Sequence, residues 1–150
     1  GRAKATVSVA ESGTHGGVGG RLVARDPTGQ HFKRAALGAT LPALAHAVGL
    51  DERPEVADVE VALRFAKGVR ATSETTFGLC VLVHSDPDAP TEGWIHIAIA
   101  GDDLAVRRTA CIVGGAERVR VGGTEMGLDC LRRQLLGLPV EDPVDFEKQR

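Results

Sequence analysis

The chain has 150 residues, of which 43% are hydrophobic, and its formal net charge at pH 7 is −2. This length and composition predict one globular domain over residues 1–150, with a core over about 6–136 and a charged tail over 140–150. The basic residues are scattered along the sequence, which argues against the concentrated positive surface of a nucleic-acid-binding domain.

The cysteines are three in number, an odd count without paired spacing, and each lies in a segment that we expect to be buried: Cys80, Cys111 and Cys130. Thiols of this kind fit a reducing compartment better than a disulfide framework. No apolar run approaches the roughly 18–20 residues of a membrane span, and the first residues lack the pattern of a signal peptide. We therefore expect a cytoplasmic protein that does not enter a membrane.

A glycine-rich turn follows the first predicted strand. Val7 to Ala10 alternate as in a strand, and a helix is predicted over 16–25. The backbone N–H groups at such a helix start lie at the positive end of the helix dipole, which favours anions or carbonyl oxygens. The predicted ligand-binding residues are Gly13, Thr14, Gly16 and Gly17, beside the hydroxyl of Ser12. The alternative is that these small residues only allow the helix to pack closely on a sheet.

The rest of the chain predicts further strands and helices. In order, they are a strand over 32–39, helices over 41–48 and 54–70, a strand over 76–83, a loop over 84–93, strands over 94–100 and 105–113, and a helix over 116–136. Glycines in the last helix indicate a close packing neighbour, and its predicted core face holds Val121, Leu128, Leu131 and Leu135. This order predicts an α/β fold, a three-layer sandwich with a mixed sheet and one antiparallel hairpin.

Several short motifs over residues 6–136 belong together. They are Ala10-Glu11-Ser12-x-Thr14-x-Gly16, Arg21-Leu22, Gly93-x-x-x-Ile97-Ala98-x-Ala100-Gly101, Val106-Arg107-Arg108, Glu117-Arg118-Val119-Arg120 and Leu128-x-x-Leu131-Arg132-Arg133. Together they resemble the C-terminal domain of the competence/damage-inducible CinA family. The resemblance implies that fold and a nicotinamide mononucleotide amidohydrolase activity, with Ser12 as the nucleophile, no cofactor and a homo-oligomeric assembly.

The sequence departs from the family pattern within the motif and beyond it. Gly13 and His15 stand where the family has cysteine and glycine, and the family's tyrosine and lysine align with Ala39 and Leu44. Neither alanine nor leucine can move a proton, and a serine hydroxyl is a poor nucleophile without a base. We therefore expect degraded deamidase machinery, a pseudoenzyme whose pocket still binds a small phosphate-bearing ligand or a partner.

The alternative is an active nicotinamide mononucleotide amidohydrolase at Ser12 with a replacement base. His15, three residues after Ser12, is one candidate for that base, and Lys33 is another.

Other polar residues predict no further site. His84, Asp86 and Asp88 could ligate a metal, but Pro87 and the lack of a second cluster favour a solvated loop, so no metal is expected. His96 is interpreted as a hydrogen-bonded, half-buried histidine. The strand that begins at Trp94 and the glycine-lined last helix predict a surface for self-association, as a homodimer or a larger assembly.

Overall fold

The computed structural model of the chain describes residues 4–140. The predicted charged tail therefore lies, apart from residue 140, outside the described residues. The elements are β1 (Val7–Ser12), α1 (Gly17–Arg25), β2 (Phe32–Leu37), α2 (Leu41–Ala47), α3 (Val59–Ser73), β3 (Phe77–Asp86), β4 (Ala89–Gly101), β5 (Leu104–Val113) and α4 (Ala116–Leu136). Their order along the chain is the one that the sequence predicts.

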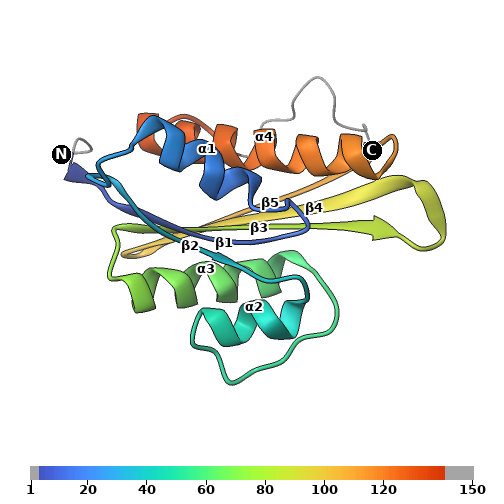
Figure 1. The fold of residues 1–150 in the computed structure, drawn as a ribbon, viewed down its shortest axis with the longest axis horizontal. Helices are drawn as coiled ribbons and strands as arrows, with labels where there is room; N and C mark the ends of the chain where they lie inside the picture. Colours follow the sequence, from blue (N-terminus) through green and yellow to red (C-terminus); the bar gives the residue numbers. More distant parts are fainter. Residues whose placement is uncertain (1–3, 141–150) are drawn as a thin grey trace.

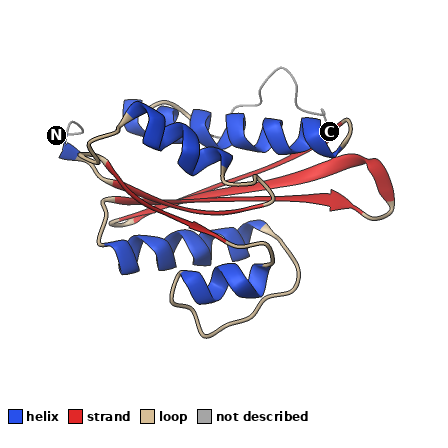
Figure 2. Cartoon of the chain, in the orientation of Figure 1, coloured by secondary structure: helices blue, strands red, loops and turns tan. Residues whose placement is uncertain are grey.

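The strands form one mixed sheet in the order β2-β1-β3-β4-β5. β1 runs parallel to β2 and β3, whereas β3 with β4 and β4 with β5 are antiparallel pairs. Helices α1 and α4 cover one face of the sheet, and α2 and α3 cover the other (Figure 1; Figure 2). The α/β sandwich with a mixed sheet is confirmed, with two antiparallel pairings where the sequence predicted one.

The core has two halves, one on each face of the sheet, because successive side chains of a strand point to opposite faces. Val9 and Leu79 belong to the half beneath α1 and α4. Ala10 and Cys80 belong to the half against α2 and α3. Every residue of β1 is buried, so this strand contributes to both halves at once.

The predicted loop over 84–93 is wrong, since most of it is strand. β3 continues to Asp86 and β4 begins at Ala89, with His84 paired to Trp94 across the two strands. The aspartates and prolines of this stretch favour turns, but pairing with a neighbouring strand outweighs such local preferences.

Helix α3 begins five residues later than predicted. Asp58 is its N-cap and accepts a hydrogen bond from the backbone N–H of Val61 at 2.8 Å. Such a side-chain acceptor replaces the missing partner of an N–H in the first turn and so fixes where the helix starts. Val56, which lies within the helix predicted over 54–70, precedes the observed helix and is 74% exposed.

The glycines of α4 pack against the sheet, as predicted. An added Cβ would lie 2.3 Å from Val83 Cγ2 at Gly123 and 2.6 Å from Val81 Cγ2 at Gly127. These two glycines are therefore used inside the molecule and do not form a surface for self-association. The core face assigned to α4 is partly wrong, because Val121 is 43% exposed.

The three cysteines are free and buried, as expected. Among residues 4–140, every helix is too short or too polar to cross a membrane.

Candidate functional site

The glycine-rich turn between β1 and α1 is organised by Glu11, whose side chain is fully buried. Its carboxylate accepts hydrogen bonds from the backbone N–H groups of Val18 at 3.1 Å and Gly19 at 2.8 Å, and from the Thr14 hydroxyl. The N–H of Gly17 donates to the Thr14 carbonyl at 3.0 Å. The first amides of α1, which the sequence interpretation left open for an anion, thus have partners within the chain.

The backbone of this turn requires glycine at two positions. Gly13 has φ +83° and Gly16 has φ +77°, in the left-handed region that other residues rarely adopt. A Cβ on Gly13 would also lie 2.1 Å from the carbonyl oxygen of Val83. The turn therefore crosses β3 in direct backbone contact, which explains why a side chain such as the family's cysteine does not fit at Gly13.

Close packing explains a third glycine of the turn region. A Cβ on Gly17 would lie 2.8 Å from Thr124 Oγ1 on α4. Gly17 therefore packs against α4, and the alternative interpretation, close packing of α1 on the sheet, holds at Gly19, where a Cβ would lie 2.7 Å from Ala35 Cβ on β2. Whether Gly13, Thr14, Gly16 and Gly17 contact a ligand stays a prediction.

Ser12, the last residue of β1, lies on the opposite face of the sheet from Glu11 and borders a pocket of about 670 Å³. Among residues 4–140, no group donates a hydrogen bond to the Ser12 hydroxyl or accepts one from it. The volume lies within the usual range for small-molecule sites. The lining residues are Ser12, Ala39, Thr40, Leu41, Pro42, Glu55, Val56, Ala57, Leu82, Val83, His84 and Pro87.

His84, on the wall of this pocket, is hydrogen-bonded to a second histidine. Its Nε2 lies 3.2 Å from His96 Nε2, and His96 Nδ1 lies 3.1 Å from Thr109 Oγ1. The ring of His96 also stacks on Trp94, with ring centroids 6.3 Å apart. The predicted hydrogen bonding of His96 is confirmed, but at 7% exposure this residue is buried and not half-buried.

His96 is neutral at physiological pH. Burial, and after it the neighbouring His84, lower the pKa of His96 to about 4, against an opposing contribution from Asp58. A neutral imidazole has one N–H and one acceptor nitrogen. When His96 Nδ1–H donates to Thr109, its Nε2 accepts from His84 Nε2–H, and His84 Nδ1 is then left with a free lone pair.

The predicted replacement bases lie outside the lining of the Ser12 pocket. His15 is exposed, and it contributes, after Arg120, to lowering the pKa of Glu117 at the start of α4. It is therefore close to α4, on the other face of the sheet. Lys33 donates to the carbonyl of Gly29 at 2.6 Å, before the start of β2.

The two positions that the resemblance assigns to proton-transfer residues differ in their surroundings. Ala39 lines the pocket beside Ser12, whereas Leu44 is fully buried in the core against α2 and α3. Sequence reasoning considered His84 only as a metal ligand, and among the described residues no group of three or more potential ligands is arranged around a metal position. Extending the predicted strand through His84 would have placed this residue on the face of Ser12.

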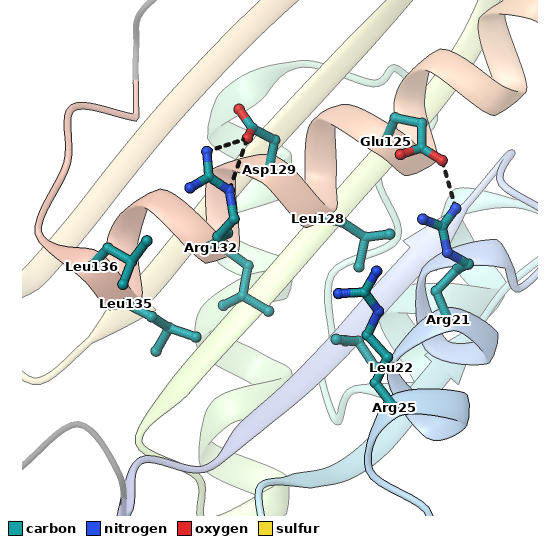
Figure 3. Close-up of a pocket in the computed structure, with 10 residues that line it drawn as sticks. Arg21, Leu22, Arg25, Glu125, Leu128, Asp129, Arg132, Leu135 and Leu136 are labelled. Atoms are coloured by element: carbon teal, nitrogen blue, oxygen red, sulfur yellow. Dashed lines mark hydrogen bonds and ion pairs between the residues drawn. The ribbon is translucent and has the colours of Figure 1, made fainter.

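A second groove lies on the other side of the sheet, between α1 and α4. It has a volume of about 430 Å³ and an apolar floor that includes Leu22 and Leu128 (Figure 3). Arg21 pairs with Glu125 at 2.5 Å, and Arg132 pairs with Asp129 at 2.9 Å. These two pairs neutralise one another within the groove, and Arg25 of α1 lines it beside them.

No family model matches the chain. A CinA-like protein of Frankia casuarinae is 34% identical over 143 residues, which cover 90% of this chain and 33% of that protein. A CinA-like protein of a Cyanothece species is 32% identical over 144 residues, covering 89% and 34%. The chain belongs to the CinA-like family. It spans about one third of the length of these relatives.

Solved structures agree on the fold. The competence/damage-inducible protein CihA of Agrobacterium tumefaciens has a TM-score of 0.71 at 19% identity, covering 89% of this chain and 87% of that one. A CinA superfamily protein of Enterobacter cloacae has a TM-score of 0.74 at 15% identity, covering 89% and 83%. At these identities the likeness establishes the CinA fold alone.

Proposed function

We propose that this CinA-like domain is a binding module whose small-molecule site is the pocket at Ser12, and that the deamidase machinery of the family is degraded in it. The observation that supports the proposal is the combination of a Ser12 hydroxyl without a partner, among the described residues, and a wall that holds Ala39 where the family has a tyrosine. Leu44, at the lysine position, is fully buried and cannot ionise. The pocket therefore keeps room and a hydroxyl but lacks the family's base.

The proposed ligand is a pyridine nucleotide of the nicotinamide mononucleotide type. Hydroxyl-bearing Ser12 and Thr40 line the pocket together with His84, and these groups suit the carboxamide and ribose of such a ligand. A phosphate would find the amides of Val18 and Gly19 already bonded to Glu11. Thr14, whose hydroxyl donates to Glu11, is not assigned a phosphate contact, and Gly13 and Gly16 stay predicted contacts that lie outside the residues lining the pocket.

The second candidate is an active nicotinamide mononucleotide amidohydrolase with Ser12 as the nucleophile. General-base assistance contributes about 10²- to 10⁴-fold to such a reaction. If the domain is instead a binding module without the family's base, ammonia release should be no more than about a thousandth of that of an intact family member.

One experiment separates the two candidates. Isothermal calorimetry with nicotinamide mononucleotide should show binding to the native chain, and Ser12→Ala should weaken it, whereas Ser73→Ala on α3 should not. Ammonia release should stay low in all three proteins. Robust ammonia release that Ser12→Ala abolishes would establish the second candidate, and the absence of binding heat would exclude this ligand.

We also propose that the domain is a homodimer or a larger assembly. The resemblance supports this, although Gly123 and Gly127 of α4 pack against the sheet and cannot contribute. Sedimentation should give a mass above that of the 15.7 kDa chain at micromolar concentration. A monomer under those conditions would contradict the proposal.

A further inference from the structure

We propose that His84 is the general base for Ser12, held in place by His96 and Thr109, so that Ser12 can be acylated by activated esters and phosphonylated by fluorophosphonates. This inference is independent of the nucleotide proposed above as the ligand, because it concerns the reactivity of the hydroxyl. It assigns to His84 a role that the family's tyrosine and lysine positions do not provide.

Strand register places the two side chains together. Ser12 on β1 lies opposite Leu82 on the adjacent, parallel β3. His84 is two residues further along β3, on the same face and about 6–7 Å away along the strand, within reach of an imidazole ring. The contact of Gly13 with the backbone of Val83 holds the end of β1 against this part of β3. Ser12 and His84 accordingly line one pocket.

The hydrogen bonds of His84 prepare it to accept a proton. A catalytic base in this type of site is oriented by an acceptor on its second nitrogen. In the tautomers that this role requires, His84 Nε2–H donates to His96 Nε2, 3.2 Å away, and His96 Nδ1–H donates to Thr109 Oγ1, 3.1 Å away. His84 Nδ1 then carries the lone pair that can take the Ser12 proton. Here a neutral imidazole replaces the carboxylate that usually orients the base.

Glu55 is the other ionisable side chain on the pocket wall. It is exposed and lies in the segment before α3, whereas His84 is on the strand that pairs with the strand of Ser12. A base must also lie within reach of the proton that it removes. The geometry therefore favours His84, and Glu55 provides a direct comparison.

The proposed reaction with p-nitrophenyl acetate transfers the acetyl group to Ser12. Ser12 Oγ bonds to the acetyl carbon while its proton passes to His84 Nδ1, and the bond to p-nitrophenolate breaks with its electron pair. His84 then releases the proton to solvent, and water later cleaves the acetyl-serine to acetate and free Ser12. With a fluorophosphonate, Ser12 Oγ bonds to phosphorus and fluoride departs. An amide is a much less reactive acyl donor than a p-nitrophenyl ester or a fluorophosphonate, so low deamidase activity is compatible with this reactivity.

The test measures the rate of fluorophosphonate labelling of the intact chain, with the labelled residue located by peptide mass spectrometry. Labelling should fall on Ser12 and be absent in Ser12→Ala. His84→Gln should slow it by about 10²- to 10⁴-fold. His46→Gln, a change of an exposed histidine on α2, should leave the rate unchanged.

Each contrary result overturns the proposal. An unlabelled native chain, or equal labelling in His84→Gln, excludes His84 as the base. If Glu55→Gln loses labelling while His84→Gln is labelled at the native rate, Glu55 is the base. Circular dichroism melts of all variants identify any that fail to fold. If His84→Gln does not fold, His84→Asn replaces it, and p-nitrophenyl acetate hydrolysis replaces labelling as the measurement.

The positioning role of His96 has its own readout. His96→Leu removes the acceptor for His84 and should lower the labelling rate at unchanged melting temperature, whereas His96→Gln keeps an acceptor and should recover most of it. Equal rates in both variants would contradict the positioning role. Nucleotide binding is measured separately, so loss of binding with His84-dependent labelling would refute the proposed ligand and leave this inference standing.

Discussion

Replacing Glu11 tests whether a buried carboxylate holds the start of α1. This side chain is fully buried and accepts from two backbone N–H groups, those of Val18 and Gly19, and from the Thr14 hydroxyl. Negative charge at this position also interacts favourably with the helix dipole. In Glu11→Ala, three donors lose their acceptor at once.

The expected cost follows from these bonds. A buried donor without a partner costs about 1–3 kcal/mol. Thr14 can rotate and water can reach part of the space left by the side chain, so we expect the three lost hydrogen bonds to cost about 4 kcal/mol together. For a chain of this size that corresponds to a decrease of roughly 8–16 °C in Tm. Glu11→Gln replaces one oxygen by a donor, which leaves one N–H facing another, and should cost about 1–3 kcal/mol.

Urea unfolding followed by circular dichroism measures both variants. The matched control is Glu117→Gln, which removes a carboxylate from the first turn of α4 that is exposed and pairs with Arg120. Exposed pairs contribute little to stability, so this control should unfold like the native chain. If Glu11→Gln were as stable as the control, the carboxylate would not be what satisfies the α1 amides.

Three further predictions concern the core and the histidine pair. Gly123→Ala should destabilise the fold by about 1–3 kcal/mol in urea unfolding because its Cβ would lie 2.3 Å from Val83 Cγ2, whereas Gly20→Ala, with nothing within 4 Å, should stabilise α1 slightly. Burial lowers the pKa of His96 from 6.5 to about 4, so between these pH values the unfolded chain binds more protons than the folded chain. The free energy of unfolding should therefore fall as the pH drops from 6.5 to 4. His96→Gln should flatten this pH dependence. Burial raises the pKa of Cys80, so this thiol should react with a disulfide reagent only after unfolding, and reaction in the native state would contradict its burial.

Local patterns were sufficient to predict most of the fold. The predicted starts and ends of α2 and α4 agree with the structure because Thr40 caps the start of α2 and Gly137 caps the end of α4, by chemistry that acts over a few residues. The prediction of a loop around His84 was wrong because the structure of this stretch depends on pairing with Trp94, ten residues away, and composition does not report such pairing. The core face of α4 was misassigned at Val121, because Gly123 and Gly127 face the sheet there, whereas Leu131 is buried as predicted.

The candidate site was predicted only in part. Ser12 was identified from its motif and does border a pocket. The partner of the helix amides was missed, since Glu11 was considered only as part of that motif and its buried side chain could have faced either side. His15, chosen for its nearness in sequence, lies near α4, because a left-handed turn with φ 55° at this residue separates it from Ser12.

Glu11 and Ser12 are neighbours in sequence that serve opposite sides of one strand. The first secures a helix on one face of the sheet, and the second faces the pocket on the other. The pocket can therefore be randomised in a library, at Ser12, Ala39 and Thr40, without touching the contacts that hold α1. An insertion or deletion of one residue within β1 would exchange the two side chains, placing a charge in the pocket and a hydroxyl beneath the helix, and we expect selection to tolerate substitutions here far better than changes in length.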